Sequence, residues 1–139
     1  MEPVMDVAGL TAFLAEAFPE VDGEFAVDTV TDDGVMVRLL VGDRHLRPGG
    51  TVSGPAMFSL ADVGVYLAVL SRIGPVALAV TTNCSIDFMR KPVAAQDLVA
   101  TVRLLKLGKR LAVGDVLIRS AGETAIVARA SLTYAIPDR

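Results

Sequence analysis

The sequence is poor in the residues that most often build redox and metal sites. It has no tryptophan, one cysteine (Cys84), one histidine (His45) and 5% aromatic residues in 139 positions. A single cysteine excludes a disulfide within the chain, and we expect no zinc site, because such sites need three or four protein ligands. Cys84 lies in an apolar strand pattern, which favours an unreactive core thiol.

Charge and hydropathy exclude two further classes of partner. The net charge is -3, whereas a nucleic-acid-binding domain usually has a basic face. The apolar run 55–70 carries an acid and is shorter than the roughly 20 residues of a membrane span. Glu2 and Asp6 stand where a signal peptide has positive charge. We therefore expect a cytoplasmic protein with no membrane or nucleic-acid partner.

The same run predicts a central helix. Ser53 and Gly54 supply N-cap chemistry, Pro55 suits the first turn, and Gly74 ends the pattern shortly after Arg72. These signals predict one helix of about four to five turns. Apolar residues occupy nearly every side of it, which is typical of a buried helix.

Asp62 is the only charge in this run. Ser59 and Tyr66 share its face of the helix, since they stand three residues before it and four after it. An ionised carboxylate in such a place must be solvated, hydrogen-bonded or shifted in pKa. The polar stripe is therefore expected to face a polar cleft or water.

The remaining segments predict one more helix and a sheet. Residues 6–18 have a helical period, and Pro19 ends it. Extended patterns rich in β-branched residues occupy 25–31, 35–41, 77–90, 98–106, 111–120 and 124–135. We expect the last four to form an antiparallel meander, because their connections look short. An economical α+β arrangement curls this sheet around the buried helix.

Several motifs in order resemble a known family. They are TVSGPAMFSLADVGVYLAV, TTNCSIDFMRKP, LVATVRLLKLGKRLAVGDVLI and ETAIVARASLTYAI. Together they resemble the hotdog-fold acyl-CoA thioesterases of the phenylacetate-pathway type, over roughly residues 40–136. The resemblance implies a hotdog fold, with an antiparallel five- to six-stranded sheet wrapped around one long central helix. We expect a single domain over 1–139, with an N-terminal helical extension at 1–20 and the hotdog core at 24–136.

The resemblance also implies a reaction. Such enzymes cleave the thioester of an acyl-CoA with a carboxylate, as nucleophile or as the base that activates water, and with a helix-start N–H as oxyanion hole. Asp62 matches the carboxylate, Gly54 the N–H, and Thr81 a supporting hydroxyl. No metal and no cofactor is implied, apart from CoA as part of the substrate.

Helix geometry adds a statement about assembly. Eight residues of helix separate Gly54 from Asp62, about 12 Å along the axis, which is too far for both to touch one carbonyl. The site must then combine two chains of a homodimer, with Asp62 of one protomer facing Gly54 of the other. The resemblance implies that such dimers often pair into homotetramers.

Some positions depart from the family pattern. Ser53 stands where the family has a histidine in its His-Gly-Gly helix start, and Arg47 where it often has an asparagine. If Arg47 points into the site, it would hold Asp62 ionised and favour anionic acyl groups. Two further candidates to bind substrate are Tyr66, which either orients Asp62 or fills the cleft, and Asn83, which stands close to Thr81. The candidates for the CoA phosphates are Arg90, Lys91, Lys109 and Arg110.

Other interpretations stay open at this point. Asp62 can be a structural buried acid, Gly54 a mere helix cap, and the basic residues a solvated turn. His45, in a loop, is expected to be exposed and without a role. Besides hydrolysis, the chain fits a non-catalytic acyl-CoA-binding module, or less well a hotdog dehydratase or hydratase.

Overall fold

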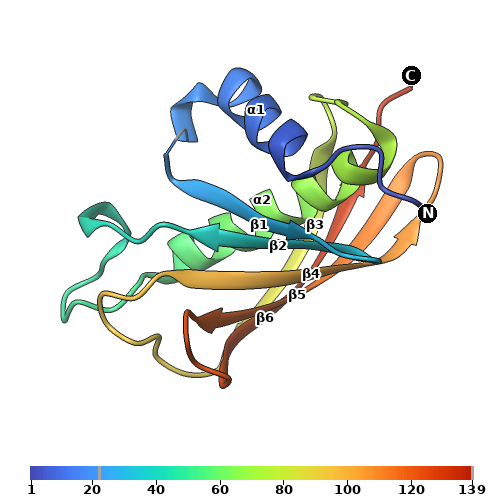
Figure 1. The fold of residues 1–139 in the computed structure, drawn as a ribbon. Coiled ribbons are helices and arrows are strands. Elements are labelled where there is room, and N and C mark those ends of the chain that lie inside the picture. Colours follow the sequence, from blue (N-terminus) through green and yellow to red (C-terminus); the bar gives the residue numbers. More distant parts are fainter. Residues whose placement is uncertain (22, 139) are drawn as a thin grey trace.

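The computed structural model describes residues 1–21 and 23–138. Helices and strands follow one another in the order α1, β1, β2, α2, β3, β4, β5, β6 (Figure 1). Two short 3-10 helices, η1 (Pro19–Val21) and η2 (Asp43–His45), interrupt the loops. The bounds are α1 Val7–Ala17, β1 Phe25–Val30, β2 Gly34–Leu39, α2 Gly54–Ile73, β3 Val80–Phe88, β4 Leu98–Leu107, β5 Leu111–Ser120 and β6 Ile126–Ala135.

The strands form one antiparallel sheet with the order β1-β2-β4-β5-β6-β3. The predicted α+β class, with an antiparallel sheet around one long helix, is confirmed. The prediction of a four-strand meander is wrong for β3, which pairs with β6 at the edge of the sheet and not with β4. The reason is the connection 89–97, which is too long for a tight turn and carries the chain across the sheet to the place beside β2.

The central helix begins and ends where its sequence signals predict. The Ser53 hydroxyl oxygen accepts the Ala56 N–H at 3.3 Å, and Pro55 stands in the first turn. At the other end Gly74 adopts a φ of 90°, which favours glycine, and its N–H donates to the Leu70 carbonyl at 2.9 Å. These caps satisfy groups that every helix end leaves without intrahelical partners.

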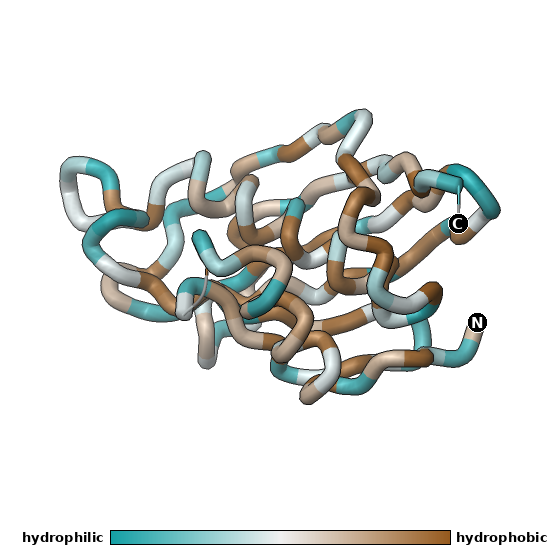
Figure 2. The backbone as a smooth tube through the Cα atoms, turned by 90° about the horizontal axis from the view of Figure 1, so that it is seen from above, coloured by the Kyte–Doolittle hydropathy of each residue, from teal (hydrophilic) through white to brown (hydrophobic). Residues whose placement is uncertain are grey.

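Helix α2 packs directly on the sheet. A Cβ atom on Gly64 would lie 2.9 Å from the Val102 side chain, and one on Gly114 would lie 2.9 Å from Val65. Both glycines therefore permit close contact between α2 and strands β4 and β5. Hydrophobic residues run along the helix and strands, and hydrophilic ones gather in the end loops (Figure 2).

Helix α2 is long and apolar enough to cross a membrane, so length alone does not exclude a span. However, 72% of its most apolar window is buried inside the fold. Leu60, Leu67 and Leu70 are fully buried against the sheet, and each such side chain contributes roughly 1.5–3 kcal/mol through burial. This burial is what is expected of a core helix.

The N-terminal helix α1 covers one edge of the sheet. Asp6 caps it by accepting the Gly9 N–H at 2.8 Å, and Leu10 and Leu14 are buried against the core. In Figure 1, α1 lies outside the sheet beside β1. The opposite edge, β3, consists of exposed and partly buried residues and has no fully buried one. Within the described chain, β3 is therefore the edge that no other element covers.

Candidate active site

Three elements meet at the carboxylate of Asp62. The side chain projects from the middle of α2 and is partly buried. Its Oδ1 atom accepts a hydrogen bond from the Thr81 hydroxyl on β3 and another, at 2.8 Å, from the Tyr134 hydroxyl on β6. Tyr134 also lies 2.9 Å from the main-chain carbonyl of Asp62. The carboxylate is therefore fixed in orientation by hydrogen bonds from two neighbouring strands of the sheet.

The second carboxylate oxygen is differently placed. Among the residues that the structure describes, none donates a hydrogen bond to Oδ2 of Asp62. An ionised carboxylate has about four acceptor positions, and here the occupied ones belong to Oδ1. Oδ2 is consequently the oxygen available to a water molecule or a substrate.

Tyr134 is the residue at this site that the sequence analysis missed. It is buried, and burial followed by the Asp62 charge raises the pKa of its hydroxyl well above the usual value. The hydroxyl therefore keeps its proton and acts as a donor to Asp62. The available signal was the period of two in β6, which places Tyr134 on the same face as buried Leu132 and Ala130.

A cavity of about 260 Å³, the Asp62 cavity, opens beside this carboxylate. Its other walls, besides Asp62 and its two hydroxyl partners, are Phe18, Val21, Val63, Tyr66, Ala79 and Val80. Tyr66 does not orient Asp62, because its hydroxyl donates to the Ala77 carbonyl at 3.1 Å. Its ring instead forms part of a largely apolar wall.

The first turn of α2 presents one available amide. Pro55 has no N–H, the Ala56 N–H is bonded to the Ser53 hydroxyl, and the Met57 N–H donates to the Ser53 carbonyl at 3.2 Å. Among the described residues, no acceptor is found for the Gly54 N–H. This amide sits at the positive end of the helix dipole, where negative charge is stabilised.

Gly54 opens onto a different cavity, the Gly54 cavity, of about 340 Å³. The cations Arg47, Arg90 and Lys91 line it, together with Thr51, Val52, Met57, Phe88, Met89 and Pro92. A Cβ atom on Gly54 would lie 3.3 Å from the Phe88 ring, so the small residue keeps this approach open. Within one protomer Arg47 therefore belongs with Gly54, and it does not line the Asp62 cavity.

The other predicted binding residues do not join these groups within one chain. Lys109 and Arg110 lie in the β4–β5 turn, just before Leu111. Leu111 pairs with Ala135 on β6, and Ala135 pairs with Val80, so this turn lies level with the start of β3. Arg90 follows the other end of β3, so the basic residues expected to bind the CoA phosphates are divided between the two ends of that strand. Asn83 follows an irregularity in the β3–β6 ladder and is exposed, on the strand face opposite Cys84 and Ile86.

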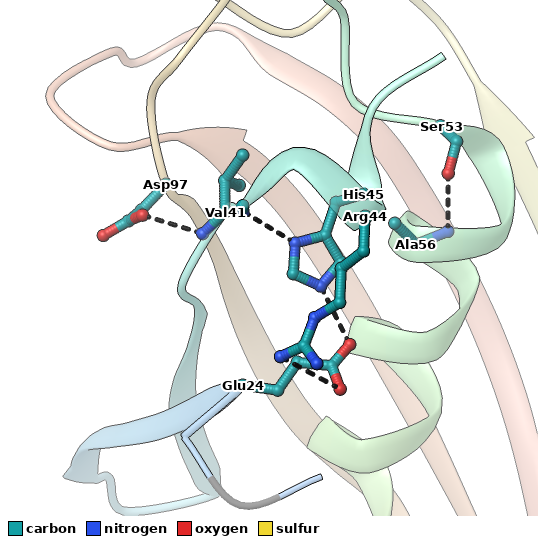
Figure 3. A network of polar contacts seen from close by, with 8 residues as sticks. Glu24, Val41, Arg44, His45, Ser53, Ala56 and Asp97 are labelled. Carbon is teal, nitrogen blue, oxygen red and sulfur yellow. Dashed lines mark hydrogen bonds and ion pairs between the residues drawn. The ribbon is translucent and has the colours of Figure 1, made fainter.

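His45 is buried, so the expectation of an exposed loop residue is wrong (Figure 3). Its Nδ1 accepts the Gly42 N–H at 2.8 Å, and its Nε2 lies 2.9 Å from Glu24 Oε1. Since a backbone N–H only donates, Nδ1 carries no proton and Nε2–H donates to Glu24. The His45 carbonyl accepts the Ser53 N–H at 2.7 Å, so this pair supports the loop before Gly54.

Cys84 lies on the inner face of β3 and is partly buried. Burial, and secondarily the charge of Asp62, raises the pKa of its thiol. A raised pKa leaves less thiolate, which is the reactive form. The residue therefore has the environment of an unreactive thiol.

Comparison with known proteins places this geometry in a family. The family model described as the thioesterase superfamily matches residues 49–127, more than half of the chain, and this segment contains Gly54, Asp62 and Thr81. A curated protein of Pseudomonas aeruginosa, provisionally named an esterase (PA0474), is 32% identical over 103 residues, which are 74% of this chain and 75% of that protein.

Two solved structures are similar over most of their length. A provisionally named thioesterase (TM1040_1390) from Silicibacter sp. TM1040 has a TM-score of 0.92 and 58% identity, covering 99% of this chain and 95% of that one. A mutant of the phenylacetic acid degradation protein PaaI from Thermus thermophilus has a TM-score of 0.72 and 27% identity, covering 86% of this chain and 99% of that one. The chain therefore belongs to the thioesterase superfamily, and its general activity is that of a thioesterase.

Proposed function

We propose that this protein hydrolyses acyl-CoA thioesters to a free acid and CoA, at sites shared between the two chains of a homodimer. The observation that carries the proposal is the Asp62 carboxylate, whose Oδ1 is held by Thr81 and Tyr134. Its free Oδ2 is left beside a largely apolar cavity. A fixed carboxylate with one open oxygen suits a general base or a nucleophile.

The separation of the two cavities supports a site made by two chains. Residues 79–81, at the start of β3, line the Asp62 cavity, and residues 88–92, at its end, line the Gly54 cavity. A two-fold axis that pairs the uncovered edge β3 with its copy in antiparallel orientation places the start of one strand beside the end of the other. The Asp62 cavity of one chain then adjoins the Gly54 cavity of its partner.

The exposed apolar residues are consistent with this pairing. Leu78 and Val80 at the start of β3, and Phe88 and Met89 at its end, are all at least half exposed in the single chain. Large apolar side chains exposed at both ends of an uncovered edge strand are consistent with an interface. Pairing along β3 would bury all four side chains and satisfy the free edge of the strand.

The chemistry follows from this arrangement. The thioester carbonyl oxygen accepts a hydrogen bond from the partner's Gly54 N–H, which stabilises the negative charge that develops there. Either Asp62 Oδ2 takes a proton from a water whose oxygen attacks the carbonyl carbon, or Oδ2 attacks that carbon and water cleaves the resulting anhydride. In both routes the carbon–sulfur bond breaks, and CoA leaves as a thiolate that takes up a proton. No metal or additional cofactor is required.

The basic residues suit the other end of the substrate. Arg47, Arg90 and Lys91 surround the Gly54 cavity, where the phosphates of CoA would find flexible cations. Reversal of β3 in the dimer also moves Lys109 and Arg110 of one chain toward the end of its partner's β3. We place the enzyme in the cytoplasm as a homodimer that can pair into a tetramer.

The experiment is a thiol-release screen of purified protein over short, long, branched and aromatic acyl-CoAs, with Asp62→Asn alongside. We expect release of CoA by the wild type and a loss of at least about 100-fold in the variant, the lower range for removing a general base. Asp32→Asn, in the exposed β1–β2 turn, is the matched control and should keep wild-type rates. Hydrolysis that survives Asp62→Asn in a folded dimer would contradict the proposal.

A further inference from the structure

Three aromatic rings lead away from Asp62 through its cavity. The rings of Tyr134 and Tyr66 have centroids 6.1 Å apart, and the rings of Tyr66 and Phe18 meet edge to face at 5.5 Å. Tyr134 touches the carboxylate, so the row extends from the reacting group to Phe18. An extended apolar group attached to a thioester at Asp62 would lie along these rings.

Phe18 closes the far end of this row from a different part of the chain. It follows α1 directly, as the C-terminal cap residue, and its N–H donates to the Leu14 carbonyl at 2.8 Å. Val21, in η1, lines the cavity next to it. Both residues lie outside the segment 49–127 that matches the family model. The N-terminal segment therefore supplies one wall of a cavity whose other lining residues come from α2, β3 with the residue before it, and β6.

The chemistry of the lining defines what the Asp62 cavity can accept. Among the described residues, Asp62 is the only charged one in the lining, and no cation lines it. An acyl group that carried its own carboxylate would bring a second negative charge close to Asp62, and none of the described residues that line the cavity in the same chain is a cation that compensates it. The volume of about 260 Å³ exceeds the roughly 150 Å³ of a cavity that holds benzene, so a medium-sized apolar group fits.

We propose that Phe18 is a specificity-determining residue, which ends the acyl pocket and selects uncharged apolar acyl groups of medium size. The proposal rests on the proposed hydrolysis of acyl-CoA at Asp62. It goes further by assigning to α1 the limit on acyl length.

The first test measures kcat/KM for saturated acyl-CoAs of 2 to 16 carbons with the wild type and with Phe18→Ala. We expect the wild-type optimum at medium length, and in Phe18→Ala a shift of that optimum by two or more carbons. Selectivity for each added methylene that becomes buried should rise by up to about fourfold. Phe13→Ala removes the other phenylalanine of the N-terminal helical segment, which packs on the core outside the cavity, and should keep the wild-type profile.

A matched pair of four-carbon substrates tests whether the pocket selects uncharged acyl groups. Butanoyl-CoA should be hydrolysed at least about tenfold faster than succinyl-CoA, which adds a carboxylate at the same chain length. If the wild type hydrolyses acyl-CoA but Phe18→Ala keeps the wild-type dependence on chain length, the inference is overturned. Equal wild-type rates for butanoyl-CoA and succinyl-CoA would also overturn it. Either result would leave the proposed hydrolysis intact.

A binding measurement separates the two proposals when turnover is absent. The chain has no tryptophan, so Phe18→Trp introduces a single tryptophan, which can be excited selectively over the two tyrosines, at the end of the cavity. In an Asp62→Asn background, octanoyl-CoA should change the emission saturably, and CoA alone should not. If octanoyl-CoA alone changes the emission and the wild type hydrolyses no acyl-CoA, the proposed function is contradicted and the acyl pocket at Phe18 is not. Equal responses to octanoyl-CoA and CoA would contradict the acyl pocket at Phe18.

Discussion

The hydroxyl of Tyr134 lies 2.8 Å from Oδ1 of Asp62 and donates a hydrogen bond to it. Thr81 donates to the same oxygen from the neighbouring strand. Because both donors reach Oδ1, the carboxylate cannot rotate without losing them, and Oδ2 keeps no hydrogen-bond donor among the described residues. In the proposed mechanism, Tyr134 is therefore a positioning residue that acts on the reaction through Asp62.

Tyr134→Phe should lower kcat about tenfold or more, with a smaller change in KM, because it removes one of the two bonds that orient Asp62. Loss of the buried hydroxyl should also reduce the free energy of unfolding by about 1 kcal/mol. Steady-state thiol release and urea unfolding measure the two effects. Tyr66→Phe is the comparison, since its hydroxyl is bonded to Ala77 and should affect stability more than kcat. An equal fall in kcat for both variants would contradict a specific role for Tyr134.

Local features of the sequence were sufficient to predict the central helix and the hydrogen bonding that the Asp62 carboxylate requires. Ser53, Pro55 and Gly74 act within a few residues of themselves, and the structure has the cap and the termination that they indicate. The contact of Thr81 with Asp62 agrees with the position that the family resemblance gave it. These predictions succeeded because they depend on short-range geometry or on a motif that lies in one segment.

The errors concern residues that meet only after the chain has folded. Tyr134 stands 72 positions from Asp62 and His45 stands 21 from Glu24, so no local pattern joins them. The place of β3 depends on its long-range pairing with β6. The sequence analysis instead expected β3 beside β4, because the connection between these two strands looked short. Strand order is set by such non-local contacts, which a period of two in the sequence does not encode.

His45→Ala should destabilise the fold by about 2–3 kcal/mol, because it leaves Glu24 and the Gly42 N–H without their buried partner. Chemical unfolding monitored by circular dichroism checks this value. Arg44→Ala is the matched control, since Arg44 is exposed and lies 3.8 Å from the same carboxylate. Its effect should stay below about 1 kcal/mol, as for other surface ion pairs. Similar losses in the free energy of unfolding for the two variants would show that the buried His45–Glu24 pair stabilises the fold no more than the exposed ion pair does.

Arg90→Gln and Lys91→Gln should each raise KM for acyl-CoA up to about fivefold with little change in kcat, because exposed ion pairs contribute up to about 1 kcal/mol. The effect should shrink in 1 M salt, where the Debye length is about 3 Å. An acyl-N-acetylcysteamine thioester, which lacks phosphates, should show no change. Arg103→Gln, whose guanidinium pairs with Asp33 at 3.0 Å, is the protein control. Equal increases in KM for both substrates would exclude a contact with the phosphates.

The central claim is that Asp62 of one chain works with Gly54 of the other, and a mixed dimer tests it. Asp62→Asn removes the carboxylate, and Gly54→Pro removes the helix-start N–H at the first helical position, where the backbone accepts proline. The Phe88 ring, 3.3 Å from a Cβ atom built on Gly54, must shift slightly to admit it. The preceding Ser53 is already extended, with φ -72° and ψ 156°, as a residue before proline requires. Differently tagged chains carrying one change each can be co-expressed and purified as the heterodimer.

Each parental homodimer should hydrolyse acyl-CoA at about one hundredth of the wild-type rate or less. In the heterodimer, one site combines both defects and the other joins an intact Asp62 to an intact Gly54, so the rate should recover to about half of wild type. The decisive measurement is therefore CoA release by the purified heterodimer. Recovery to that level supports the shared site, and a folded heterodimer as inactive as its parents would contradict it.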